Sequence, residues 1–365
     1  MKKVFWLTLV VVLALVMIAG CGDTPAEEAP EEEAPEETPG EEAPETGTSK
    51  LGLGVVTSIA RSNDAAEGVN AQAQTDVTIA AVLFDEEGRV VSLMIDTAQT
   101  RVAFDEEMQV ATDTSVPGQT KVERGDDYGM KRVSEIEMEW YEQIAELENW
   151  MIGKTVEEIK SLPVKVVDDA HQHVPDIPEL TSVVTITVEG YIAAVENAYN
   201  NSIEVENAET VGLGTDISTA RSYGLDEAND IMPRAQVDNT MAAVAFDSDG
   251  VIVGAIIDNA QIRVEFDAEG QVTSDRAASP KTKAQLGDDY GMRRVSDIDK
   301  EWYEQIEALS DWMVGKTVDE VLGLPVKVVD DAHQNVPDVP ELTSSVTITV
   351  ESYLAAVAKA YDYAR

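Results

Sequence analysis

The chain has 365 residues and a formal net charge of −44, with 70 acidic against 26 basic side chains. A surface this acidic repels phosphate backbones and anionic lipids, which excludes nucleic acid as a partner and argues against a protein that lies flat on a membrane. Cys21 is the only cysteine in the chain, so an internal disulfide is excluded and the folded part must be stabilised by its hydrophobic cores.

The first 21 residues (1–21) have the pattern of a bacterial lipoprotein signal. Two lysines precede an apolar run over residues 4–17, which is short for a membrane span, and the small residues Ala19 and Gly20 precede Cys21. In such signals the cysteine is lipidated and becomes the mature N-terminus. We therefore expect an extracytoplasmic protein, lipid-anchored to the bacterial cell membrane through Cys21; an uncleaved anchor is the alternative.

Residues 22–49 consist mainly of Glu, Pro, Ala, Thr and Gly. One Asp and ten Glu between Asp23 and Glu45 give this segment a charge of −11. Like charges repel, proline blocks regular structure, and too little apolar area is present to offset the entropy lost on ordering. We interpret the segment as a disordered acidic tether between the membrane and the rest of the chain.

The remainder of the chain contains one block written twice. GDDYGMKRVSEIEMEWYEQI begins at Gly125, and GDDYGMRRVSDIDKEWYEQI begins 162 residues later, so that Tyr128 matches Tyr290. Internal similarity at a fixed offset predicts two tandem copies of one domain. We place these domains at residues 50–202 and 210–365.

Each copy begins with β-rich segments that are separated by turn sequences. In the first copy these segments are residues 51–62, 76–84, 89–98, 100–104 and 109–113. Short turns such as Asp-Glu-Glu-Gly join neighbouring segments into hairpins. Each copy is therefore predicted to begin with an antiparallel meander of about five strands.

After Gly125 the apolar residues recur at helical spacing. The apolar face of the first predicted helix comprises Ile136, Trp140, Ile144, Leu147 and Met151. Ser134 with Glu137 forms a capping-box pattern before this helix, and Thr155 with Glu158 forms another before a short second helix. In the last helix, the side chains expected to point inward are Tyr191, Val195 and Tyr199. The prediction is an α+β fold with the strands of each copy first and two or three helices after them.

A Ser/Thr-rich turn precedes the last helix of each copy. It contains Ser182 and Thr185 in the first copy, and Ser344 and Thr347 in the second. Hydroxyls and backbone N–H groups at a helix N-terminus can bind a phosphate. A β-rich entry with an ordinary helix cap is the alternative interpretation of the same residues.

With its strands, central helix and Ser/Thr turn, each copy resembles the FMN-binding domain family. That family has a Ser/Thr-Gly-Ala-Ser/Thr motif near its C-terminus, often with an acidic residue three positions earlier. In the first copy the acid is Glu179 and both hydroxyls are present, but Val183 and Val184 replace Gly-Ala. The second copy has the same pattern, with Ser345 and Val346 between its hydroxyls.

The family includes flavin-carrying subunits of sodium-pumping and Rnf-type electron-transfer complexes, and membrane-anchored lipoproteins. The resemblance implies that the cofactor is FMN, with its phosphate at this turn and, in the family, a phosphoester to the last Thr or Ser. Side chains in place of glycine crowd a phosphate, which argues against covalent attachment here.

A phosphate in so acidic a chain requires nearby cations. For this role we predict Lys131 and Arg132 in the first copy, and Arg293 and Arg294 in the second. Other cations at matched positions are Arg61/Arg221, Arg101/Arg263, Lys121/Lys283, Lys154/Lys316 and Lys165/Lys327. Each of these could equally pair with a surface carboxylate.

Neither catalytic residues nor a metal site are predicted. The run Asp168-Asp169-Ala170-His171-Gln172-His173 invites a metal interpretation, but Asn335 stands at the second copy's match to His173. A site with two histidine ligands cannot therefore be common to both copies.

Two functional hypotheses follow. The first is a surface-tethered flavin carrier in extracytoplasmic electron transfer, which would pass electrons to redox partner proteins rather than turn over a substrate. The second is a non-catalytic double-domain lipoprotein that has lost the cofactor and serves as a binding or structural module. The sequence leaves the partner and the oligomeric state open.

Overall fold

The computed structural model describes residues 47–169, 171–331 and 333–365. Thr46–Arg365 forms one compact unit of mixed α and β structure. The predicted signal 1–21, Cys21 and most of the predicted tether 22–49 lie outside the described residues. The tether prediction was wrong at its end, because a strand already begins at Thr48 and pairs there with Glu206.

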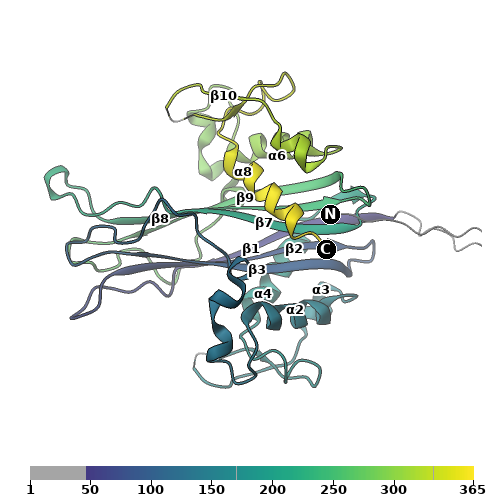
Figure 1. Ribbon diagram of the computed structural model, residues 1–365, viewed down its shortest axis with the longest axis horizontal. Helices are drawn as coiled ribbons and strands as arrows, with labels where there is room; N and C mark the ends of the chain where they lie inside the picture. Colours follow the sequence, from purple (N-terminus) through teal and green to yellow (C-terminus); the bar gives the residue numbers. More distant parts are fainter. Residues whose placement is uncertain (1–46, 170, 332) are drawn as a thin grey trace, which may run out of the picture. The chain divides into compact units, whose positions relative to one another are not determined.

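Two antiparallel sheets form the centre of the unit (Figure 1). The first has the order β3-β2-β1-β6, with β1 (Thr48–Ser58), β2 (Gln72–Phe84), β3 (Val90–Ala103) and β6 (Ile203–Glu206). The second has the order β7-β8-β9, with β7 (Thr210–Ser218), β8 (Arg234–Phe246) and β9 (Ile252–Glu265).

The prediction of five meander strands per copy was wrong in number. The segments 89–98 and 100–104 form one continuous strand, β3, because β2 pairs with it along nearly its whole length. The segment 109–113 contributes only an isolated bridge between Phe104 and Val110. The two other short strand pairs are β4 (Val164–Lys165) with β5 (Val174–Pro175), and β10 (Val326–Lys327) with β11 (Val336–Pro337).

The two sheets pack face to face and share a hydrophobic core, in which Ile79 of β2 and Met241 of β8 are fully buried. Strand β2 lies against its equivalent in the second half, β8. Strand β1 lies against β9, and β7, the equivalent of β1, lies against β3, the equivalent of β9. This exchange of equivalent strands is the arrangement of a two-fold symmetric interface. Whether residues 50–202 and 210–365, called the first and second halves below, also fold as separate domains stays a prediction.

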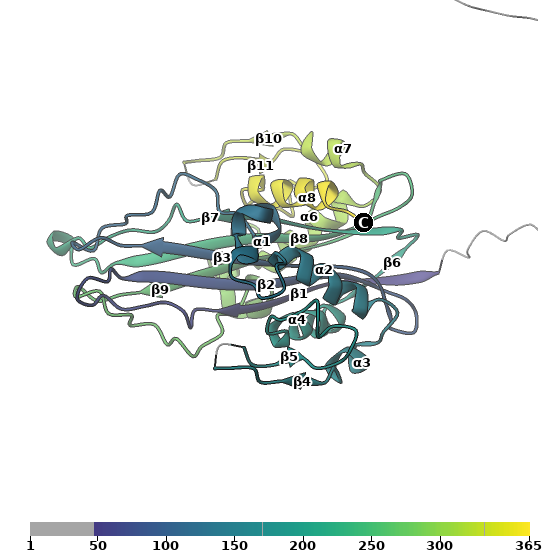
Figure 2. The same ribbon diagram turned by 60° about the horizontal axis from the view of Figure 1, so that its bottom comes forward.

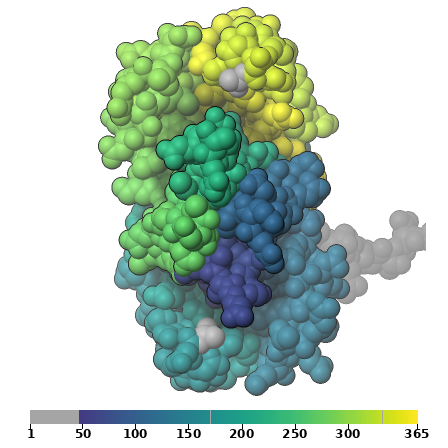
Figure 3. All heavy atoms as spheres, turned by 90° about the vertical axis from the view of Figure 1, so that its left-hand side faces the viewer, coloured from purple at the N-terminus to yellow at the C-terminus, as the bar shows by residue number. Residues whose placement is uncertain are grey.

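Loops at one end of the two sheets make reciprocal contacts of the same kind. The N–H of Ala65 donates to the carbonyl of Gly270 at 2.9 Å, and the N–H of Leu225 donates to the carbonyl of Met108 at 3.0 Å. Figure 3 shows this end, where purple and blue segments of the first half lie among teal and green segments of the second. The two halves therefore bind each other through reciprocal hydrogen bonds as well as apolar contacts.

Helices cover the outer face of each sheet, which makes four layers (Figures 1 and 2). On the first sheet lie α2 (Trp140–Met151), α3 (Val156–Lys160) and α4 (Glu189–Asn200). On the second sheet lie α6 (Trp302–Met313), α7 (Val318–Leu322) and α8 (Glu351–Asp362). The shorter helices are α1 (Lys121–Arg124), η1 (Gly125–Tyr128), η2 (Met130–Arg132), η3 (Glu227–Asn229), α5 (Lys283–Leu286), η4 (Gly287–Tyr290) and η5 (Met292–Arg294).

The last helix of each half lies unusually close to its sheet. A Cβ atom on Gly54 would lie 1.7 Å from the carbonyl oxygen of Ala194 in α4, and one on Gly214 would lie 2.0 Å from that of Ala356 in α8. Glycine is therefore needed at these two positions for the close approach of a helix.

Most of the predicted helix features are confirmed, and two are wrong. The Thr155–Glu158 capping box and its counterpart at Thr317 are present, and Trp140 is buried. The first predicted helix does not begin after Ser134, because Glu137 has a left-handed φ of 53° and Glu139 caps α2 instead. Tyr199 is 38% exposed rather than inward, and its ring makes a T-shaped contact with the ring of Phe84 at a distance of 5.2 Å between ring centres.

Candidate functional site

The Ser/Thr turn of the first half is held by a buried glutamine. The N–H of Thr185 donates to Oε1 of Gln143 at 2.9 Å, and the Thr185 hydroxyl lies 3.3 Å from the same oxygen. Gln143 lies on α2 and is fully buried, while Ser182 is exposed. Helix α4 begins only at Glu189, so the turn is not the helix N-terminus that the sequence predicted.

The backbone donors of this turn are already used. The N–H groups of Val183 and Val184 both donate to the carbonyl of Leu180, at 3.0 and 2.8 Å. A helix N-terminus binds anions through N–H groups that have no other hydrogen-bond partner, whereas the N–H groups of Val183 and Val184 already have one. Phosphate binding here would require either the Thr185 hydroxyl or a movement of Gln143.

The second half repeats this contact beside a cavity. The N–H of Thr347 donates to Oε1 of Gln305 at 2.9 Å. A cavity of about 260 Å³ lies beside Thr347, and its wall includes Ser296, Lys327 and His333. Lys327 pairs with Asp338 at 2.9 Å. Polar groups of the kind that hold a phosphate therefore surround Thr347, whereas Ser344 is exposed and lies outside this wall.

The cations predicted to meet these turns lie elsewhere. Lys131 and Arg132 line a separate open hollow together with acidic residues of η1 and of the loop before α2. Arg293 forms an ion pair with Glu304 at 2.6 Å, and this carboxylate raises the pKa of the guanidinium. Neither Arg293 nor Arg294 lines the cavity around Thr347. The structure does not bring the two predicted parts of the site together.

The difference between His173 and its match, Asn335, has a structural explanation. His173 and Asn335 both have a left-handed backbone, with φ of 55° and 52°, a conformation that asparagine tolerates well. His173 contacts Glu189 at 3.2 Å, and the amide of Asn335 donates to Glu351 at 2.9 Å. The two side chains thus make the same contact to the first residue of the last helix. Among the described residues no group of three or more potential metal ligands is assembled.

A polar network that the sequence analysis did not predict lies on the outer face of each sheet. In the first half Arg101 donates to Gln74 at 2.9 Å and to Gln99 at 3.4 Å. Both glutamine amides donate in turn to Asp76, at 2.9 and 3.0 Å. The register of β2 and β3 sets this geometry, since it places Gln74 opposite Arg101 and Asp76 opposite Gln99.

The same network recurs on the second sheet. Arg263 donates to Gln236 at 3.0 Å and to Gln261 at 3.3 Å, and both amides donate to Asp238, at 2.8 and 2.9 Å. Arg101 and Arg263 were among the matched cations of the sequence. The sequence analysis missed the two glutamines of each network. The available signal was a glutamine two residues before Asp on one strand and two residues before Arg on the next.

Next to each network a lysine lies between aromatic rings. Nζ of Lys121 is 5.1 Å from the centre of the Tyr128 ring and 4.9 Å from that of Trp140. Nζ of Lys283 lies in the same way, 5.2 and 5.3 Å from the rings of Tyr290 and Trp302. Burial lowers the pKa of each lysine to about 8. Such a lysine is partly deprotonated near neutral pH, which makes it more nucleophilic than an ordinary surface lysine.

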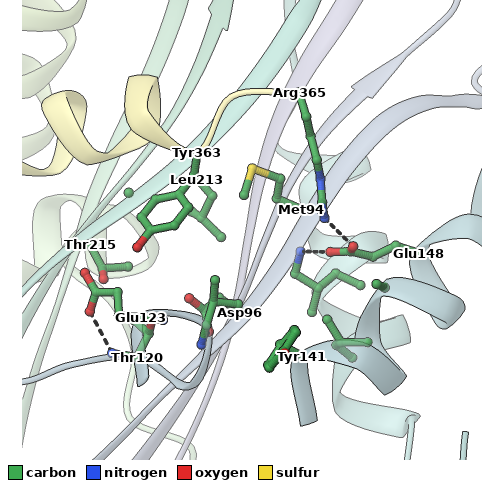
Figure 4. Close-up of a pocket in the computed structure, with 15 residues that line it drawn as sticks. Met94, Asp96, Thr120, Glu123, Tyr141, Glu148, Leu213, Thr215, Tyr363 and Arg365 are labelled. Carbon is green, nitrogen blue, oxygen red and sulfur yellow. Dashed lines mark hydrogen bonds and ion pairs between the residues drawn. The ribbon is translucent and has the colours of Figure 1, made fainter. Parts of the chain in front are cut away.

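A small cavity of about 170 Å³ lies where the first half meets the second (Figure 4). Glu148 of α2 accepts the N–H of Ile95 at 2.6 Å and forms an ion pair with Arg365 of the second half. Burial raises the pKa of Glu148 to about 7, although Arg365 lowers it in part. Burial likewise raises the pKa of Asp96 to about 6. Cavities that enclose organic ligands usually measure about 300–1,000 Å³, so this one suits only water or a very small molecule.

The comparisons with known proteins show a short similarity and no family. No family model matches the sequence, and no solved structure matches it. The chain is 31% identical over 104 residues to a chlorophenol reductase of Desulfitobacterium hafniense. The match covers 26% of this chain and 32% of that protein, so the chain spans about a third of the relative's length. In the part of the chain that the structure describes, no helix has both the length and the hydrophobicity of a membrane span.

Proposed function

We propose that the chain is a lipid-anchored extracytoplasmic protein built from two tandem FMN-binding-like copies, and that it carries a flavin in electron transfer. The observation that carries the proposal is the position of Thr347. This residue matches the last hydroxyl of the family motif, and it lies in the wall of a cavity that also contains a lysine and a histidine. The relative's name, a reductase, is compatible with redox chemistry.

The cavity around Thr347 fits part of an FMN molecule. Its volume of about 260 Å³ is below the usual range for pockets that enclose a whole cofactor, so it suits the phosphate end. The Thr347 hydroxyl, the Ser296 hydroxyl and the Lys327 ammonium group would hold this phosphate by charge-assisted hydrogen bonds. Bound FMN would supply the redox chemistry, and the protein would act as an electron carrier with redox partner proteins.

A second candidate function is favoured by Gln143 and Gln305. Each glutamine accepts from the threonine N–H and lies close to the threonine hydroxyl, so both turns are satisfied without any phosphate. This contact is expected of a copy that has lost its cofactor, because a buried polar group needs a partner. The chain would then be a non-catalytic double-domain lipoprotein that serves as a binding or structural module.

Titration of the purified protein with FMN distinguishes the two functions. We expect a yellow complex whose dissociation constant rises about tenfold or more in Thr347→Val, because one hydrogen bond to a charged group is lost. A covalent site would instead lose all flavin. Ser344→Ala is the control, since Ser344 belongs to the same turn but is exposed and lies outside the wall of the cavity. Thr185→Val tests the first half in the same way.

If the wild-type protein binds no FMN at micromolar concentrations, the carrier proposal is wrong and the structural function stands. Binding that is equally weakened by Ser344→Ala and Thr347→Val would place the phosphate elsewhere.

A further inference from the structure

Seven cations gather in two clusters, although acidic side chains outnumber basic ones in the chain by 70 to 26. The first cation cluster is Arg61, Arg101, Lys121 and Arg124, and the second is Arg221, Arg263 and Lys283. In the first, Arg61, Arg101 and Arg124 all lie close enough to Tyr128 to lower its pKa against the effect of burial. In the second, Arg221 and Arg263 act on Tyr290 in the same way.

None of these seven cations forms an ion pair with a carboxylate of the described residues, although other cations such as Arg89, Lys160 and Arg293 do. Asp76, the carboxylate of the first network, accepts hydrogen bonds from the amides of Gln74 and Gln99 rather than from a cation. The carboxylates that act on the lysine are Asp76 and Asp96 in the first cluster and Asp238 and Asp258 in the second. The cations outnumber them in each cluster, which leaves a local excess of positive charge. That charge attracts an anion from solution.

The clusters are held in place before any ligand arrives. Two glutamines orient the Arg101 guanidinium, and two aromatic rings flank Lys121. Arg124 lies over the outer ring of this pair, with Cζ 5.1 Å from the centre of Tyr128. Figure 2 shows α1, which carries Lys121 and Arg124, in front of the strands and beside α2. A preorganised group loses less conformational entropy on binding, which favours affinity.

We propose that each cation cluster is a binding site for a phosphate group. Guanidinium groups match phosphate oxygens with two parallel hydrogen bonds, and the ammonium group adds a compact charge. The first cluster has one cation more than the second, because Leu286 occupies the position that matches Arg124. The first site therefore binds phosphate more tightly. This inference does not depend on the proposed flavin function, since none of these cations lines the cavity around Thr347.

The charges around each lysine set how binding depends on pH. Arg61 and Arg124 lower the pKa of Lys121, and Asp76 and Asp96 raise it, although burial has the largest effect. In the second site burial again dominates, Arg221 and Arg263 lower the pKa of Lys283, and Asp238 and Asp258 raise it. A bound phosphate favours the charged lysine, so affinity falls as the pH rises through about 8.

Calorimetric titration of the full chain with inorganic phosphate tests the proposal. We expect two sites of unequal affinity, and a dissociation constant at least about tenfold higher for each site in Arg61→Gln/Arg221→Gln. Both arginines are exposed, so their replacement leaves the fold intact. Arg89→Gln/Arg234→Gln is the matched control, because it also removes two positive charges, from ion pairs with Glu158 and Glu265. Equal phosphate affinity in the double variant and the wild type would overturn the proposal.

Labelling with pyridoxal 5′-phosphate gives an independent readout and tests a phosphate that belongs to a larger molecule. Its aldehyde condenses with a deprotonated lysine to an imine with loss of water, and added borohydride supplies the hydride that fixes the bond. We expect peptide mapping to find Lys121 and Lys283 labelled faster than Lys131, and inorganic phosphate to slow this labelling. Labelling of all three lysines at one rate, unaffected by phosphate, would contradict the proposal.

Discussion

The two halves of the chain share an architecture and differ at the surface where they meet. The first half has Glu148 on α2, and the second has Ser310 at the matching position. Glu148 pairs with Arg365 across the interface, while the Ser310 hydroxyl is buried without a hydrogen-bond partner among the described residues. The comparison shows that the shared core depends on apolar side chains common to both halves. The Glu148–Arg365 ion pair has no counterpart at Ser310.

The largest expected effect comes from separating the halves. Residues 210–365 expressed alone would expose the inner face of the second sheet, including Met241 and Ile262, which are buried in the whole chain. Because the interface exchanges equivalent strands, a second copy of the same half can cover this face. We expect a homodimer by analytical ultracentrifugation, whose stability depends on protein concentration. A monomeric half with a cooperative unfolding transition would show instead that the halves are independent domains.

Removing one of the ion pairs between the halves, Glu148–Arg365, is the next largest change. Arg365→Ala leaves the buried Glu148 carboxylate without its cation, and we expect the free energy of unfolding at pH 8 to fall by about 3 kcal/mol. Adding Glu148→Ser makes the first half resemble the second and should restore most of this loss. Urea unfolding measures both variants. If the double variant is as unstable as Arg365→Ala, the buried charge is not the cause.

The smallest effect is a difference in pH dependence. Burial raises the pKa of Glu148 from 4.5 to about 7, so between these values the folded protein keeps a proton that the unfolded chain has lost. Its contribution to stability is therefore complete below pH 4.5 and is lost as the pH rises to 7. Glu148→Gln should reduce the fall in the free energy of unfolding over this window by roughly 2–3 kcal/mol.

Asp96 and Asp258 serve as the internal reference for that measurement. Burial raises the pKa of both to about 6, so the two halves contribute equally between pH 3.8 and 6. An unchanged pH profile in Glu148→Gln would mean that the carboxyl group is hydrated in solution. Asp258→Asn should alter only the lower part of the profile.

Local features of the fold could be predicted from the sequence, and contacts between halves could not. The spacing of Trp140, Ile144 and Leu147 predicted a buried helix face, and Thr155 predicted a cap, because both signals depend on near neighbours. The core that the two halves share gives no comparable signal in the sequence. Both faces of the strands are covered, so their sequences are continuous apolar runs that do not show which element lies on which side.

The candidate sites were predictable to a similar extent. Matched cations identified Arg101 and Lys121, because the second half keeps a cation at each position. Their grouping follows from the pairing of β2 with β3 and from the position of α1, neither of which can be read from spacing alone. Gln143 gave no signal, since one glutamine on a helix does not reveal that it is buried and bound to Thr185.

The connection between the halves fixes their local concentration. Strand β6 links them directly, pairs with β1 and contributes Val205 to the shared core. A short covalent link of this kind gives each half an effective partner concentration on the order of millimolar or higher, however dilute the protein is. The link also allows the two surfaces to differ in sequence. A substitution in a homodimer appears in both subunits, whereas a substitution in this chain appears in one half only. Arg124 and Leu286 stand at matched positions and could not differ in a homodimer.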